Sequence, residues 1–139
     1  MKWILRFMAT SFVYLPAGLV LLLSEITGIF HVRSDAIFVL WLFGFVAMMV
    51  FGLSYMFVSG LTRKTASMNS TMSAEYIFLN LGIISFFVGY SGLIGPSLGV
   101  YFASAGLTLL LLSALMHAAN MVRAVKGVGN ASPRSREED

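Results

Sequence analysis

Few residues of this 139-residue chain are of types that could carry out chemistry. There is no cysteine, so thiolate metal sites and thiol catalysis are excluded, and the two histidines, His31 and His117, stand far apart. His31 follows the first long apolar run, whereas His117 lies near the end of the last one. If these runs cross a membrane, the histidines lie at opposite ends of a hydrocarbon core about 30 Å thick. One haem iron needs axial atoms about 4 Å apart, given metal–nitrogen bonds of about 2 Å. A haem held by both histidines of one subunit is therefore excluded.

A single histidine or methionine could still hold a cofactor. His117 could ligate one alone, or it could hydrogen-bond Asn120 or a carbonyl one turn earlier, and we expect the structural role. Met56 and His31 are weaker candidates for a ligand. Thioethers suit Cu(I), but the nine methionines are better explained by packing and lipid contact. We predict no catalytic residue, no metal site and no cofactor, with haem b left open.

The remaining polar residues of interest are amides and carboxylates. Asn80 and Asn120 fall near one end of their apolar runs, and an amide in lipid usually bridges helices. We expect a buried polar cluster of Asn80, His117 and Asn120, with Arg6 as a further member. We expect the three carboxylates that could matter at the ends of the runs: Glu25, Asp35 and Glu75. An absence of carboxylates inside the membrane argues against a proton-coupled transporter.

The elements that must position these residues are four apolar runs, at 3–24, 36–59, 76–94 and 98–122. Each offers about 19 to 25 residues, enough to cross a bilayer as a helix. The composition agrees, with 58% apolar residues, 11% charged residues and a mean hydropathy of +0.88. The sequence predicts an all-α polytopic membrane protein. A four-helix transmembrane domain over residues 1–126 precedes a polar, disordered tail over residues 127–139.

The positive charges predict how the four helices are oriented. Of the nine Lys and Arg residues, only Arg33 falls in the loop after the first or third run. The positive-inside rule therefore predicts both termini on the cytoplasmic side, in a plasma membrane of prokaryotic type. Basic residues at run ends would meet anionic headgroups rather than nucleic acid. The eight residues on the cytoplasmic side are Lys2, Arg6, Arg63, Lys64, Arg123, Lys126, Arg134 and Arg136.

Small residues recur every three or four positions in the last two runs. Such stripes let helices approach closely, because van der Waals contact replaces hydrophobic attraction inside lipid. Four helices can bury one stripe and present another outward, which predicts a partner, either a second copy or another membrane subunit. The residues are Gly82, Ser85 and Gly89 in the third run and Gly99, Ala103 and Gly106 in the fourth.

The second run contains the pattern Gly44-Phe45 … Phe51-Gly52-x-x-Tyr55. It resembles the second helix of short four-helix membrane proteins related to haem-copper oxidase subunit I. Further matches are Arg6, the Tyr14–Gly18 stretch, Asn80, Gly82 and Asn120. The resemblance implies a four-helix bundle without a metal ligand, because Ile37, Val39 and Met56 stand where that family has histidines.

Three functions are compatible with these features. The leading hypothesis is a non-catalytic subunit, or an accessory or assembly component, of a larger membrane complex, such as a respiratory or redox complex. The second is a b-type haem or copper electron-transfer protein, as the resemblance implies. The third is a small channel or transporter that works as a homo-oligomer.

Overall fold

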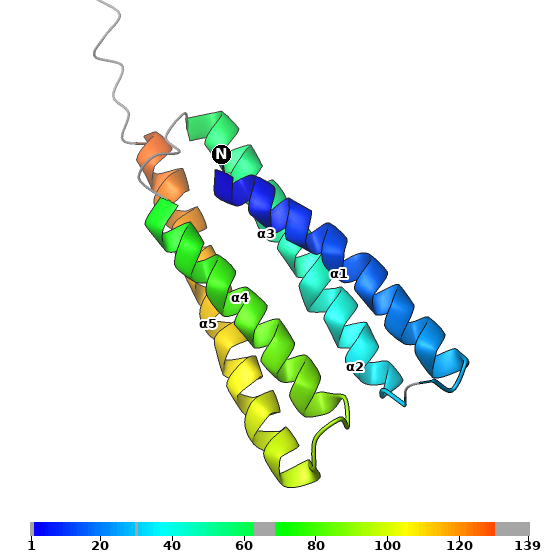
Figure 1. The fold of residues 1–139 in the computed structure, drawn as a ribbon. Helices are drawn as coiled ribbons and strands as arrows, with labels where there is room; N and C mark the ends of the chain where they lie inside the picture. Colours follow the sequence, from blue (N-terminus) through cyan, green and yellow to red (C-terminus); the bar gives the residue numbers. More distant parts are fainter. Residues whose placement is uncertain (1, 30, 63–68, 130–139) are drawn as a thin grey trace, which may run out of the picture.

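The computed structural model describes residues 2–29, 31–62 and 69–129 as an assembly of long helices (Figure 1). Helix α1 covers Lys2–Ile26. Helix α2 (Ser34–Val39), the π-helix η1 (Leu40–Ala47) and helix α3 (Met48–Thr62) then follow one another without a break as one long rod. Helices α4 (Asn69–Tyr90) and α5 (Pro96–Gly129) complete the described part.

Four stretches are long and apolar enough to cross a membrane: Lys2–Ile26, Ser34–Gly60, Thr71–Tyr90 and Pro96–Lys126. The predicted all-α class and the four candidate spans are thereby confirmed. Large apolar side chains are exposed along the helices, among them Leu5, Val13 and Leu111. Exposed apolar surface of this extent suits contact with a lipid bilayer rather than with water.

The helix bounds differ most from the predicted ones at two places. Helix α4 begins at Asn69 rather than at Tyr76, and α5 continues to Gly129, beyond the predicted limit of the transmembrane domain. The rest of the predicted disordered tail, at 130–139, lies outside the described residues. So do four of the residues used to predict the orientation: Arg63, Lys64, Arg134 and Arg136.

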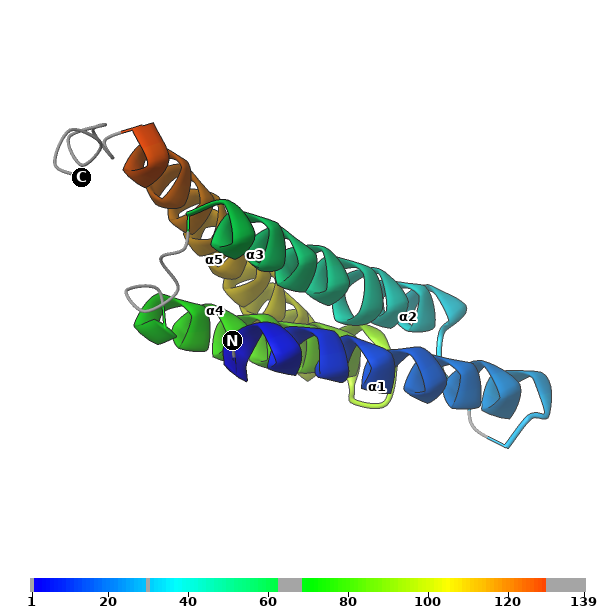
Figure 2. The same ribbon diagram turned by 90° about the horizontal axis from the view of Figure 1, so that it is seen from above.

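The rods are arranged as two antiparallel pairs, α1 with the α2–η1–α3 rod and α4 with α5 (Figures 1 and 2). Across the pairs, α3 contacts α5 and α1 contacts α4. At one end of the bundle α1 and α4 begin while α3 and α5 end; we call it the Lys126 end. The opposite end, where α1 passes into α2 and α4 into α5, is the Ser34 end. The connections there use Gly28 and Gly92 at positive φ, 72° and 83°.

Glycines make the contact between α4 and α5 close. A Cβ at Gly89 would lie 2.3 Å from the Ala103 nitrogen, and one at Gly106 would lie 2.3 Å from the Phe86 nitrogen. Ser85 adds a hydrogen bond from its Oγ to the Phe102 carbonyl, at 2.9 Å. Gly82 and Gly99 also face the other helix of the pair. The small residues of the two stripes thus meet each other inside the chain.

Glycines also shape the contact between α1 and the second rod. Gly44 faces the ring of Tyr14, and Gly52 faces the side chain of Met8, so both glycines of the resemblance pattern have a packing role here. Gly18 leaves room for Trp41, whose Nε1 donates to the Leu15 carbonyl at 3.2 Å. Gly44 lies within the π-helix η1.

Hydrogen bonds, rather than glycines, join the two helix pairs. We call this contact the seam. Thr10 Oγ1 and Tyr76 Oη are 2.6 Å apart, and Tyr14 Oη donates to Asn80 Oδ1 at 2.9 Å. Both bonds connect α1 with α4. Bonds of this kind contribute roughly 0.5 to 2 kcal/mol each between helices in lipid.

Candidate functional site

A carboxylate lies buried in the seam, where the sequence analysis expected none. Glu75 was assigned to the end of a span, but α4 begins at Asn69 and its candidate span at Thr71. Glu75 therefore lies inside the span, and its exposed fraction is 0%. This placement corrects the prediction that no carboxylate lies inside a span. Proton-coupled transport is therefore no longer disfavoured on that ground.

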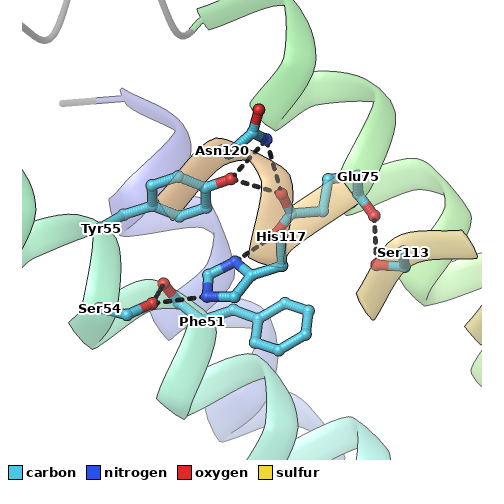
Figure 3. Close-up of polar contacts among 7 residues, drawn as sticks. All are labelled: Phe51, Ser54, Tyr55, Glu75, Ser113, His117 and Asn120. Carbon is cyan, nitrogen blue, oxygen red and sulfur yellow. Dashed lines mark hydrogen bonds and ion pairs between the residues drawn. The ribbon is translucent and has the colours of Figure 1, made fainter. Parts of the chain in front are cut away.

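Three side chains bind the Glu75 carboxylate (Figure 3). Tyr55 Oη donates to Oε2 in a very short hydrogen bond, and Asn120 Nδ2 donates to the same oxygen at 3.1 Å. His117 Nδ1 lies 2.9 Å from Oε1. Asn120 Nδ2 also donates to Tyr55 Oη at 2.9 Å. Both carboxylate oxygens are therefore bound, each from a helix other than α4.

Helix periodicity explains how these side chains meet. Ser113, His117 and Asn120 are spaced by four and three residues, so they share one face of α5. The Ser113 Oγ donates to the Glu75 backbone carbonyl at 3.2 Å, which fixes α5 against α4 at this level. Tyr55 enters from α3, so the cluster connects three helices (Figure 3).

Both ring nitrogens of His117 have partners. Nδ1 faces Glu75, and Nε2 lies 2.9 Å from Ser54 Oγ. Phe51 stacks on the imidazole with ring centroids 3.9 Å apart and an angle of 2° between the planes. A haem or metal ion could bind His117 only by displacing Glu75 or Ser54. Among the described residues, no three His, Cys, Asp or Glu side chains gather as a metal site would require.

The hydrogen bonds around Ser54 are compatible with either a neutral or a charged His117 imidazole. Ser54 Oγ has one proton, yet it lies 2.9 Å from both the Phe51 carbonyl and His117 Nε2. If Ser54 donates to Phe51, Nε2 must carry a proton, and His117 is then charged when Nδ1 also donates to Glu75. If Ser54 donates to Nε2 instead, His117 is neutral. Rotation of the Ser54 hydroxyl therefore lets His117 keep a hydrogen bond at Nε2 with or without a proton there, while the Ser54 bond to the Phe51 carbonyl forms only when Nε2 is protonated.

The structure separates the four residues predicted to form one polar cluster. His117 and Asn120 meet around Glu75, but Asn80 binds Tyr14 and donates from Nδ2 to the Tyr76 carbonyl at 2.8 Å. Arg6 lies over the Trp3 ring, with its Cζ 4.3 Å from the ring centroid. Asn80 and Arg6 are thus outside the Glu75 cluster.

The other candidate ligands lie apart from the cluster. Met56 is exposed on α3, and His31 is exposed in the connection between α1 and α2. Sequence reasoning missed Glu75, Tyr55, Ser54 and Ser113. Two signals were available: the polar spacing of Ser113, His117 and Asn120, and the Ser- and Thr-rich stretch before Glu75, which suits an earlier helix start.

The chain matches no protein-family model, no curated protein and no solved structure. The chemistry of the cluster therefore has to be inferred from its geometry.

Proposed function

We propose that this protein is an integral membrane subunit that binds and releases a proton at the Glu75–His117 pair. The observation that carries the proposal is the carboxyl of Glu75, which is completely buried inside a candidate membrane span beside an imidazole. Ionisable residues inside a membrane are costly, and they usually mark ion or proton pathways.

A purely structural role would not require an ionisable group at this position. Glutamine could also link α3, α4 and α5 by hydrogen bonds, without the cost of burying a charge. The carboxylate and imidazole are instead a pair whose proton can reside on either partner. The second hydrogen-bond arrangement at Ser54 supports the same reading, because it accommodates His117 with one proton or with two.

We further propose that the protein serves a larger membrane complex as a non-catalytic or accessory subunit. The described residues are almost entirely membrane helices, and the cluster has no free ligand position on His117. The resemblance of the second rod to the second helix of short four-helix proteins related to haem-copper oxidase subunit I favours a redox complex as the setting. In the proposed orientation, the Lys126 end faces the cytoplasm.

Infrared spectroscopy of the full chain in liposomes tests the proton site. Between about pH 10 and about pH 4, we expect a C=O stretch of a protonated carboxylic acid to appear and to be absent in Glu75→Gln. Glu25→Gln is the matched control, because Glu25 is the other glutamate within a described helix and lies at the Ser34 end. A spectrum in which neither Glu75→Gln nor His117→Gln removes a pH-dependent band would refute the proposal.

A homo-oligomeric proton channel or transporter is the second candidate, favoured by the same intramembrane carboxylate. It predicts proton flux into liposomes containing only this protein, lost in Glu75→Gln. The accessory-subunit proposal predicts a titrating Glu75 without such flux. Proton-flux measurements on the unmodified chain and on Glu75→Gln therefore distinguish a channel or transporter from an accessory subunit.

A further inference from the structure

The seam contains two separate groups of hydrogen-bonded side chains. The inner cluster consists of Ser54, Tyr55, Glu75, His117 and Asn120. The middle cluster consists of Thr10, Tyr14, Tyr76 and Asn80, further from the Lys126 end. Among the residues that the structure describes, no side-chain hydrogen bond joins a member of one cluster to a member of the other, although Glu75 and Tyr76 are neighbours in sequence.

Phe7 of α1 lies between the clusters. Its exposed fraction is 0%, so the ring is surrounded by protein. It packs edge-on against Tyr76 of the middle cluster, with ring centroids 5.2 Å apart, and against Tyr55 of the inner cluster at 6.1 Å. The ring centroid of Phe51, which stacks on His117, lies 6.5 Å from that of Phe7. An apolar ring has no group that could pass on a proton.

The inner cluster is more accessible at His117 than at Glu75. The His117 side chain is 12% exposed, whereas that of Glu75 is 0% exposed. Exposed Arg123 and Lys126 follow His117 on α5 toward the same end. The imidazole is therefore the more accessible partner of the pair.

Few titratable groups of the described helices lie near the Glu75–His117 pair. From α3 only Tyr55 faces Glu75, and from α5 only His117 does so. On α4 the neighbouring titratable group is Tyr76, which turns to Thr10. On α1, Arg6 stacks on Trp3, which in turn packs against Tyr76 at 5.8 Å between ring centroids.

We propose that Phe7 is the barrier that confines proton exchange of the Glu75–His117 pair to the Lys126 end of the bundle. This inference rests on the proposed proton site and adds the side from which it is loaded. It makes the pair a group that reports or buffers the pH of one aqueous phase. A route through the membrane would require the Phe7 ring to leave the seam.

The first experiment measures sidedness in the unmodified full chain. Proteoliposomes with the protein inserted in one direction allow the pH of each aqueous phase to be changed separately. We expect the infrared band of Glu75 to follow the phase at the Lys126 end and to ignore the other phase. A band that follows the Ser34 side, or both sides equally, would overturn the proposal. A band that follows neither side would instead refute the proton site itself.

The second experiment tests Phe7 directly, and it does not depend on titration of Glu75. Because the chain has no cysteine, Thr10→Cys places a single thiol in the middle cluster. We expect a small charged methanethiosulfonate reagent, added at the Lys126 end, to leave this thiol nearly unreacted. Adding Phe7→Ala should raise its reaction rate by about tenfold or more, whereas adding Phe7→Leu, which keeps an apolar plug, should raise it much less.

Phe12→Ala is the matched control, because Phe12 is an exposed phenylalanine on the same helix. It should leave the rate for Thr10→Cys unchanged. Fast reaction of Thr10→Cys with Phe7 intact would show that Phe7 is no barrier. An equal increase with Phe12→Ala would attribute the effect to a general loosening of α1, and would equally contradict the proposal.

Discussion

At the scale of single residues, the cluster depends on the compensation of one buried charge. The Glu75 carboxylate accepts bonds from Tyr55, Asn120 and His117, so it serves as the shared acceptor for three donors. If the carboxylate is removed, those donors lie in a low-dielectric interior with no equivalent partner. Such buried donors are expensive because no water replaces the lost acceptor.

We therefore expect Glu75→Ala to lower the free energy of unfolding by about 3–5 kcal/mol, the range found when one partner of a buried ion pair is removed. Glu75→Gln should cost much less, because an amide can still bond two of the three partners. The control is Asp35→Ala, whose exposed pair with Arg33 should contribute at most about 1 kcal/mol. Unfolding by SDS in mixed micelles, followed by circular dichroism, measures all three. Equal losses for Glu75→Ala and Asp35→Ala would contradict the account.

The sequence allowed part of this cluster to be predicted. The sequence predicts His117 and Asn120 in a polar cluster, because both lie near the end of an apolar run and amides in lipid usually bridge helices. Glu75 was missed because the polar stretch before it was assigned to a loop. That stretch has low hydropathy, so hydropathy alone puts the start of α4 too late. The separation of Asn80 from the cluster depends on Tyr14 of α1, a contact between distant residues that no local pattern contains.

At the scale of elements, glycines and hydrogen bonds stabilise different helix contacts. Glycines bring α4 and α5 into backbone contact, while polar side chains join that pair to α1 and α3. Long apolar runs made all four spans predictable. The sequence does not predict the π-helix η1, in which Gly44 lies against Tyr14 and Trp41 donates a hydrogen bond to the Leu15 carbonyl of α1.

One of the two closest backbone contacts gives a prediction for the α4–α5 pair. In Gly106→Ala the new Cβ would meet the Phe86 nitrogen at 2.3 Å, so the helices must move apart. We expect a loss of about 1–3 kcal/mol in the free energy of unfolding, as for other overpacked sites. Gly60→Ala is the control, because nothing lies within 4 Å of its added Cβ and α3 is helical there. The free energy of unfolding of Gly60→Ala should stay the same or rise by up to about 1 kcal/mol.

At the scale of the whole molecule, the orientation in the membrane matters because the Glu75 cluster lies near one end of the bundle. The cluster lies toward the Lys126 end of the bundle, about one turn into the span that begins at Thr71, or about 6 Å along α4 at 1.5 Å per residue. Which aqueous phase it can sample is therefore decided by how the four spans are inserted. The excess of Lys and Arg at the Lys126 end predicts that this end faces the cytoplasm.

Single cysteines introduced into the cysteine-free chain test this orientation in intact cells. Ser34→Cys and Lys126→Cys are exposed positions at opposite ends of the bundle. We expect a membrane-impermeant thiol reagent outside the cells to label Ser34→Cys rapidly, and to label Lys126→Cys only after the membrane is permeabilised. The reverse pattern would show that the positive-inside prediction is wrong and would turn the Glu75 cluster toward the outer phase. Labelling of both positions in intact cells would contradict a single inserted orientation. The expected pattern would place the proton site nearer to the cytoplasmic phase than to the outer one, because Glu75 lies about one turn from the start of its candidate span.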